Sequence, residues 1–414
     1  SLTPVRDITK NFKCDEKIDK AELARLAEII KNEEQDYDDD EKEAIKKGKE
    51  FYEKCKESEN FEELESPDDR VKMRFVHVEG ETLGIGFVEA VIDATVEECA
   101  AYDYKKDTRE RLANLTTKHV LKQHIRKIND HTQLFLSIRT LRRGFSNREG
   151  HNRIMWMKEG KKIWTIYEDT DQLKKEFPVK FGNVQASLQT TWLFEPLDRV
   201  GGVSQTKVSF ASRVDIKGSV PYFIMNSFAV KKASSMIEMR KKFDKSKEVD
   251  ANKRLQIVKQ LGDLDRVQSE TFAKRFMDVA KAQKNSSGLS TAQTWVKIQG
   301  EGQGWGKTVV SVRASLEETS AFFWDIDSRV NTASDATIEI VDVEGFEKTI
   351  KRTELLGRFK GFHSLGEFTS RMKLVRTGQN ILVLDIVGVK DPSKKEEVEN
   401  KRKSSRRRSS LMET

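Results

Sequence analysis

The chain carries one sequence pattern twice: Gly84-Ile-Gly-Phe-Val-Glu-Ala-Val-Ile-Asp-Ala-Thr-Val-Glu-Glu98 and, 220 positions later, Gly304-Trp-Gly-Lys-Thr-Val-Val-Ser-Val-Arg-Ala-Ser-Leu-Glu-Glu318. Apolar residues alternate along both stretches, and this period of two predicts a strand with one buried face. Both stretches close with Thr or Ser followed three residues later by Glu, which is a capping box. We therefore predict a strand, a turn and the start of a helix at both places.

The repeat continues beyond these stretches. At the same offset, Asp107 and Arg109 match Asp327 and Arg329. Further along, the offset slips to 218, so that Arg153 matches Arg371. Self-similarity at a long fixed period indicates that one supersecondary unit is used twice.

The first copy continues with strand-like segments and ends in a long helix. Six segments between residues 119 and 216 have the pattern of antiparallel strands separated by turns. From 219 to 243, apolar residues return at helical spacing, at Met225, Phe228, Ala229, Ala233, Met236 and Met239. This order predicts an α+β helix-grip fold, in which a curved antiparallel sheet wraps around the terminal helix. One helix rarely fills such a concave sheet, so we expect a cavity between them.

At this point the sequence resembles the START-like lipid-transfer superfamily, related in fold to the birch-pollen-allergen and polyketide-cyclase group. The resemblance rests on the order of elements, on the repeated opening, on the segment 148–156, and on Asp215-Ile-Lys-Gly-Ser-Val-Pro221 leading into the long helix. It covers residues 71–245 and, for the second copy, 294–390. It implies binding of a lipid or another hydrophobic molecule, without obligatory catalysis.

The domain organisation follows from the repeat and the charge pattern. Residues 1–70 carry 23 Asp and Glu against 14 Lys and Arg, and their apolar stripes predict an acidic helical segment. A START-like domain is expected over 71–245, a helical linker over 246–293, and a partial second START-like domain over 294–390. This second copy lacks the later strands and the long helix, which would expose a sheet edge. A basic disordered tail is expected over 391–414.

Composition excludes several classes. The chain has 414 residues, a formal net charge of +7, and no run of 18 apolar residues that could span a membrane. Cys14, Cys55 and Cys99 are far apart, which favours a reducing compartment and disfavours a disulfide framework or a structural zinc site. We expect a cytoplasmic protein with no bound metal or cofactor. The chain begins Ser1-Leu2-Thr3 without a signal peptide or an initiator Met, which suggests a fragment of a longer product.

No arrangement of residues predicts catalysis. The glycines of 300–307 resemble a phosphate-binding loop, but Glu301 occupies the first glycine position and a strand follows instead of a helix. Cys99 lies in the first turn of a helix, where the pKa of a thiol can fall, but we interpret it as a small buried residue of the core. No Ser/His/Asp set or acid–base pair stands out, so we predict no enzymatic activity. Nucleic-acid binding is not expected, because basic residues are dispersed and no aromatic platform lies among them.

The candidate ligand-binding residues are those expected to line the cavity: Arg139, Arg153, Trp156, Trp192, Met225, Phe228 and Met236. For the two Trp, core packing is the alternative. Methionine suits a pocket with adaptable contents, although an ordinary core also accepts it. An inward Arg would have to be paired, and could then hold a polar head group; an outward, solvated Arg is the alternative for both.

Three functions remain open. The first is non-catalytic binding, transfer or sensing of a hydrophobic ligand under helix 219–243. The second is a protein-binding scaffold or regulatory module with a filled core, whose protein partner the sequence does not identify. The third is an enzyme of the cyclase type. The tail Lys401–Arg408 has six basic residues in eight. It is compatible with peripheral membrane contact, nuclear import, a kinase site at Ser409 or Ser410, or a solvated charge run.

Overall fold

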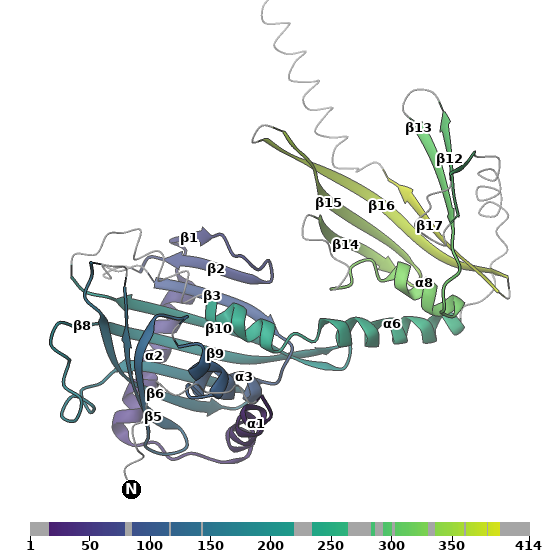
Figure 1. The fold of residues 1–414 in the computed structure, drawn as a ribbon. Helices are drawn as coiled ribbons and strands as arrows, with labels where there is room; N and C mark the ends of the chain where they lie inside the picture. Colours follow the sequence, from purple (N-terminus) through teal and green to yellow (C-terminus); the bar gives the residue numbers. More distant parts are fainter. Residues whose placement is uncertain are drawn as a thin grey trace, which may run out of the picture. The chain divides into compact units, whose positions relative to one another are not determined.

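The computed structural model describes most of the chain and divides it into two compact units, residues 1–245 and 246–414. The described residues are 16–78, 85–115, 117–141, 144–218, 234–263, 283–285, 293–299, 303–329, 336–359, 362–378 and 380–389. Unit 1 and unit 2 are described separately below. Both are built from helices and antiparallel strands (Figure 1).

Unit 1 contains four labelled helices and ten strands. The helices are α1 (Glu16–Asn32), α2 (Asp39–Glu57), α3 (Val96–Tyr104) and α4 (Arg109–Ala113). The strands are β1 (Phe61–Leu64), β2 (Val71–Val76), β3 (Ile85–Ile92), β4 (Val120–Lys127), β5 (Thr132–Arg139), β6 (Arg148–Glu159), β7 (Lys162–Asp169), β8 (Val184–Gln185), β9 (Ser187–Val200) and β10 (Val203–Asp215). A further helix is described over residues 234–242.

The strands form one sheet in the order β1-β2-β3-β10-β9-β7-β6-β5-β4. All neighbours in this order are antiparallel, and only the short β8 pairs in parallel, with β6. The hairpin of β9 and β10 lies in the middle, where it joins β3 on one side to β7 on the other. Unit 1 is therefore α+β with a large antiparallel sheet, in agreement with the predicted class.

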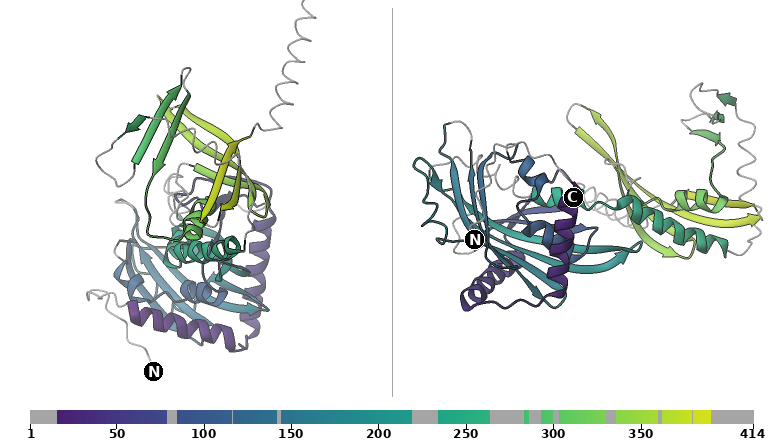
Figure 2. Two further views of the ribbon diagram at one scale, coloured as in Figure 1. Left: turned by 90° about the vertical axis from the view of Figure 1, so that its right-hand side faces the viewer. Right: turned by 60° about the horizontal axis from the view of Figure 1, so that its bottom comes forward.

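The sheet is covered on both faces, because consecutive residues of a strand point to opposite sides. On one face, which we call the inner face, Ile154 and Trp156 of β6 pack with side chains of α1, α3 and helix 234–242. On the other, the outer face, Met155 packs with side chains of α2. In Figures 1 and 2 both purple N-terminal helices lie against the teal sheet of unit 1. The acidic N-terminal segment thus contributes to the cores of the same unit.

Glycine lets α2 approach the outer face closely. A Cβ at Gly48 would lie 2.9 Å from Cγ1 of Ile166 on β7. The carbonyl of Gly48 accepts a hydrogen bond of 3.0 Å from the Thr191 hydroxyl on β9. A larger residue at position 48 would push the helix away from the sheet.

Unit 2 has two separate sheets. Strands β11 (Gln283–Asn285), β12 (Gln293–Gln299) and β13 (Gln303–Val309) form the first, and β14 (Ala336–Glu344), β15 (Glu347–Phe359), β16 (Phe362–Gly378) and β17 (Ile381–Gly388) form the second. Its described helices are α6 (Ser246–Gly262) and α8 (Leu316–Trp324). They pack on each other and, with the second sheet, bury a small apolar cluster around Trp324 and Met372.

Several details of unit 1 recur in unit 2. Thr95 and Ser315 each cap a nine-residue helix through a complete capping box. In unit 1, α1 packs on α3, and Asp19 accepts hydrogen bonds from the backbone N–H groups of Arg109 and Glu110. In unit 2, α6 packs on α8, and the N–H of Arg329 donates to Asp250. The predicted strand–turn–helix is present in unit 1. In unit 2 the capped helix is present, but β13 ends at Val309, so Val310, Val312 and Ala314 of the predicted strand lie outside it.

The structure adds to the predicted outline in two places, and two predicted segments cannot be compared with it. Strands β1 and β2 precede the first expected strand and were not predicted. The expected linker 246–293 begins with α6, which belongs to the packed core of unit 2. Of the expected helix 219–243, residues 219–233 lie outside the described residues, as does the expected tail. No helix in the described part of the chain is long and apolar enough to cross a membrane.

Candidate functional site

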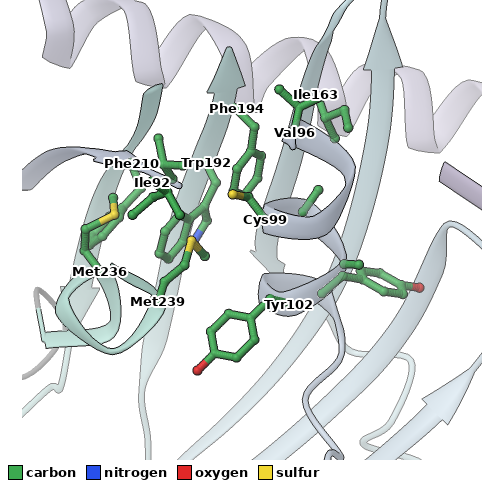
Figure 3. Packing of buried hydrophobic residues seen from close by; sticks show 14 of the residues in the cluster. Ile92, Val96, Cys99, Tyr102, Ile163, Trp192, Phe194, Phe210, Met236 and Met239 are labelled. Carbon is green, nitrogen blue, oxygen red and sulfur yellow. The ribbon is translucent and has the colours of Figure 1, made fainter. Parts of the chain in front are cut away.

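The inner face of unit 1 is lined by an aromatic cluster on neighbouring strands (Figure 3). The ring of Trp192 on β9 packs against Phe210 of β10 at 4.3 Å between centroids. It also lies parallel to Phe194 at 6.0 Å, with 4° between the ring planes. All three side chains are buried, because the register of β9 and β10 places them on one face. This arrangement forms a flat apolar wall.

Helix 234–242 and α3 cover this wall. Met236 and Met239 reach it from the terminal helix, and Cys99 and Tyr102 reach it from α3 (Figure 3). The ring of Phe243, just after the terminal helix, meets Tyr102 edge-on at 5.6 Å. Burial raises the pKa of the Cys99 thiol above its ordinary value, so this residue is an inert part of the core.

Two polar atoms in this wall have no hydrogen-bond partner among the described residues: Trp192 Nε1 and Thr165 Oγ1. Thr165 of β7 lies directly opposite Trp192 of β9 and opposite Trp156 of β6. By contrast, Trp156 Nε1 donates to the carbonyl of Asp130 at 2.9 Å. A buried indole N–H and a buried hydroxyl without a partner are each costly, so a bound polar atom would be favourable at each of them.

The Asp103 carboxylate on α3, the helix that covers this wall, is already paired. The Tyr167 hydroxyl lies 2.8 and 2.7 Å from the two carboxyl oxygens of Asp103. Lys106 Nζ contacts the same carboxyl group at 2.9 Å. Burial, and then the negative charge of Asp103, raise the pKa of Tyr167 well above its ordinary value. The Asp103 carboxylate is therefore already neutralised by its partners and does not pair with a charged ligand. Tyr167 stays protonated and does not act as a base.

The structure brings together three of the seven predicted ligand-binding residues. Trp156, Trp192 and Met236 belong to the inner-face cluster. Arg139 ends β5 on the inner face, because it lies an even number of residues from Phe135, which packs against the inner-face cluster. Part of its side chain is exposed to solvent at this strand end, and desolvation lowers its pKa. Met225 and Phe228 lie outside the described residues.

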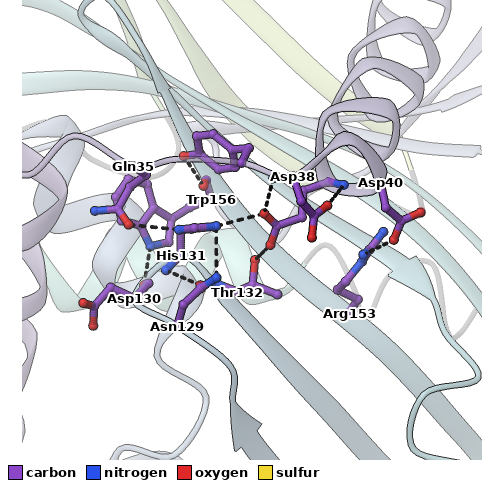
Figure 4. Close-up of polar contacts among 11 residues, drawn as sticks. Gln35, Asp38, Asp40, Asn129, Asp130, His131, Thr132, Arg153 and Trp156 are labelled. Atoms are coloured by element: carbon purple, nitrogen blue, oxygen red, sulfur yellow. Dashed lines mark hydrogen bonds and ion pairs between the residues drawn. The ribbon is translucent and has the colours of Figure 1, made fainter.

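Arg153 is separated from the other candidates, because it is on the outer face (Figure 4). Its guanidinium Nε donates to Glu168 at 2.7 Å, and Nη1 pairs with Asp40 at 2.5 Å. Burial would lower its pKa, but the hydrogen bonds and charges of these two carboxylates raise it. The prediction that Arg153 holds a head group under the terminal helix is therefore wrong, because its side chain lies on the opposite face of the sheet. Arg153 instead ties the start of α2 to the sheet.

Next to Arg153, a buried polar network fixes the same end of α2. Asp38 and Glu41 form the capping box of this helix. The Glu41 carboxylate also accepts hydrogen bonds from the Thr132 hydroxyl at 2.5 Å and pairs with His131 Nε2 at 3.1 Å (Figure 4). His131 Nδ1 lies 2.9 Å from Gln35 Oε1. Burial alone would raise the pKa of Glu41, but the hydrogen bonds from Thr132, His131 and the Asp38 backbone lower it.

Two adjoining hollows are found on the outer face, along α2, with volumes of about 270 and 260 Å³. Lys47, Gln189 and Arg213 line both. These hollows are open grooves with mixed polar and apolar walls. They lie on the opposite face of the sheet from the aromatic wall.

Sequence reasoning missed Thr165, Phe194 and Phe210 as members of the inner wall. The period of two along β9 could have added Phe194, which is two residues from Trp192. Thr165 and Phe210 could only be placed once the register between β7, β9 and β10 was known. Cross-strand register is set by tertiary pairing, which no single segment encodes.

Comparison with known proteins gives structural resemblances only. No protein-family model matches the chain, and no curated protein matches it. Among solved structures, it is similar to the human StarD13 (DLC2) lipid transfer and protein localization domain, with 14% identity, 51% of this chain and 100% of that chain covered, and a TM-score of 0.37. It is also similar to human STARD10, with 16% identity, coverage of 52% and 82%, and a TM-score of 0.38. Human StAR-related lipid transfer protein 5 gives 14% identity, coverage of 54% and 99%, and a TM-score of 0.39.

Proposed function

We propose that unit 1 is a START-like, helix-grip module that binds a hydrophobic ligand, such as a lipid, between its inner face and the terminal helix. The observation that carries this proposal is that two residues opposite each other on β7 and β9, Thr165 and Trp192, each have a buried polar atom without a hydrogen-bond partner among the described residues. A wall of aromatic and methionine side chains suits an apolar molecule of variable shape. Polar ligand atoms at these two places would fix the orientation of the ligand.

The proposed activity is binding without chemistry. Asp103 and Tyr167 are engaged with each other, and Cys99 is held as a thiol by burial. The ligand would therefore be carried or sensed and released unchanged. Cys55 and Cys99 are buried and form no disulfide within the described residues, which suits the reducing conditions of the cytoplasm.

We further propose that unit 2 is a second, incomplete copy of unit 1. Helices α6 and α8 then correspond to α1 and α3, β12 and β13 to β2 and β3, and β14 to β17 to β4 to β7. The paired caps at Thr95 and Ser315 and the paired acceptors Asp19 and Asp250 support this equivalence. Only unit 1 has the β9–β10 hairpin and the helix after it in the described residues.

Native mass spectrometry of the full chain tests ligand binding. We expect co-purifying lipid on the wild type and reduced occupancy in Trp192→Phe, which keeps an aromatic ring at this position but loses the N–H group and part of the ring volume. Trp164→Phe is the matched control, because Trp164 packs on the outer face and donates to Glu159 at 3.0 Å. Equal occupancy in all three proteins would contradict the role of Trp192. A wild type that takes up no lipid from mixed vesicles would contradict binding altogether.

One observation favours the alternative of a protein-binding module with a filled core. The buried members of the inner-face cluster have at most 8% of their surface exposed. The two hollows found among the described residues lie on the outer face instead. In this case Trp192→Phe would destabilise the chain, since the smaller ring leaves a cavity in a filled core.

A further inference from the structure

The inner face of unit 1 changes in character along its strands. One end carries the aromatic wall with Trp156, Trp192 and Phe210. Toward the other end, the same face carries small or polar residues, which lie an even number of positions from members of the inner-face cluster. These residues are Ser137, Gly150, Asn152, Thr190 and Ser212. The inner face is therefore apolar at one end and polar at the other.

Two arginines lie at the polar end of this face. Arg139 ends β5 and Arg148 begins β6, and the register places them directly opposite each other. They are an even number of residues from Phe135 and Ile154, so both belong to the inner face. Like charges directly opposite each other on neighbouring strands destabilise a sheet. An anion bound to both guanidinium groups would replace this repulsion by attraction.

Backbone carbonyl groups hold Arg148 in place. Its guanidinium Nη1 donates to the carbonyl of Ser146 at 2.6 Å, and Nη2 donates to that of Lys217 at 2.9 Å. Its Nε donates to the carbonyl of Ile216. Carbonyl groups carry no net charge, so these hydrogen bonds orient the guanidinium without neutralising it. They also tie the segment after β10 to this end of the sheet.

The sequence around the two arginines adds positive charge. Residues 139–148 contain four Arg and no Asp or Glu, and residues 216–233 contain three Lys and no Asp or Glu. The inner-face carboxylate of Asp169 is opposite Asn152, which lies about 13 Å along β6 from Arg148. It accepts hydrogen bonds from the Asn152 amide at 3.1 Å and from the N–H of Leu188 at 2.9 Å. The arginine end of the inner face is therefore positively charged.

Both guanidinium groups have lost part of their hydration. Desolvation lowers the pKa of Arg139 and of Arg148, because a cation is less stable where water is excluded. Arg139 keeps part of its side chain exposed, so a ligand can reach it from solvent. An anionic group that replaces the lost water would therefore be favourable at this end.

We propose that Arg139 and Arg148 form an anion site at the polar end of the inner face, and that the ligand of unit 1 is an amphiphile with an acidic head group. This rests on the proposed function and adds the class of ligand. Carboxylate and phosphate are the matching head groups, because a planar guanidinium binds two oxygen atoms of either. From Arg148 to Trp156, β6 extends over about 26 Å. A long acyl chain would therefore run from the arginines toward the aromatic wall.

Uptake of lipids that differ only in their head group tests this site. The full chain is incubated with oleate or with oleyl alcohol at about pH 8, where a carboxylate is ionised, and occupancy is measured by native mass spectrometry. We expect oleate to bind about tenfold more tightly than the alcohol. Dioleoyl phosphatidic acid and dioleoylglycerol form the corresponding pair for a phosphate head group. A preference for the acidic lipid in either pair supports the site and identifies its head group, and equal binding within both pairs overturns it.

A variant of Arg139 assigns this preference to the site. Arg139→Gln changes a partly exposed residue, so the chain should fold normally, bind the acidic lipid about tenfold more weakly and bind oleyl alcohol as before. Arg199→Gln is the matched control with unchanged binding, because Arg199 lies near the other end of β9 and donates to Ser204 at 3.4 Å. An equal loss in both variants overturns the site, since only net charge would then matter.

Failure of this site differs from failure of the proposed function. Binding of the neutral lipids without a preference for the acidic ones retains lipid binding and rejects the anion site. Binding of none of the four lipids rejects both. If Arg139→Gln weakens attachment to phosphatidylserine vesicles but leaves uptake of the acidic lipid unchanged, the arginines contact a membrane surface instead, and the proposal is overturned.

Discussion

Arg153 and Trp156 stand three positions apart on β6, and an odd separation on a strand places them on opposite faces. The alternation along this strand is therefore enough to separate the two candidates. It does not tell which face is the inner one. That choice depends on where α2 packs, and Asp40 at its first turn is the residue that pairs with Arg153.

Glu41→Gln should weaken unit 1 in a pH-dependent way. The folded pKa of Glu41 is lowered, so its carboxylate stabilises the fold above the unfolded pKa of about 4.3. This stabilisation is lost as the pH falls through the lowered folded pKa. We expect a loss of about 1–3 kcal/mol near pH 7, from weaker hydrogen bonds to Thr132 and His131. The difference between variant and wild type should shrink below pH 4.

Unfolding of unit 1, followed by hydrogen exchange of α2 and β5 between about pH 3 and pH 7, measures this difference. Glu43→Gln is the control, because Glu43 lies on the exposed side of the same helix and pairs only with exposed Lys47. A difference that stays constant down to pH 3 would refute the assignment of this stability to the Glu41 carboxylate.

The helices α1 and α6 are equivalent in their packing, although their sequences do not reveal it. The sequence repeat begins at Gly84, because two glycines, the apolar alternation and the capping box recur there at one fixed offset. The two helices share little identity, but both are 17 residues long and place a buried residue, Ile30 or Leu261, near the C-terminal end. Many surface helices have an amphipathic pattern of this kind, so the pattern does not show that α1 and α6 are equivalent. Only their packing in the two units shows it.

Asp19→Ala and Asp250→Ala should act on different units. Asp19 accepts from two backbone N–H groups and Asp250 from one, at the start of the segment after the capped helix, and alanine removes this acceptor from partly buried donors. We expect a cost of about 1–3 kcal/mol in each case. Because a chain of two units does not unfold in one step, local hydrogen exchange is the suitable measurement.

Asp19→Ala should increase exchange in α1 and α4 and leave α6 and α8 unchanged, and Asp250→Ala should do the reverse. The two variants serve as controls for each other. If either variant increases exchange equally in both units, the two units do not unfold independently, and the two Asp residues do not have equivalent local roles.

At the scale of the whole molecule, the sequence predicted the class of unit 1, the positions of most of its strands and the capped helices Thr95 and Ser315. It did not predict β1, β2 or the outer-face packing of α2, because these depend on contacts between segments far apart in the chain. Glu41 and Thr132, for example, are joined by a hydrogen bond across 91 positions. Such long-range pairs set which face of the sheet is inner, and therefore where a ligand is expected.

The basic tail supplies the last prediction, on attachment of the whole chain to membranes. Lys401–Arg408 has six basic residues, and each is worth about 1 kcal/mol near an anionic bilayer. Replacing Arg406, Arg407 and Arg408 by Gln should therefore weaken binding to vesicles with about 30% phosphatidylserine by roughly a hundredfold. Vesicle co-sedimentation at low and at physiological salt measures this, and the wild type should lose most binding as salt increases. Phosphatidylcholine vesicles are the control, and equal binding of the wild type to them would rule out electrostatic attachment, leaving the tail as a solvated charge run or a recognition signal.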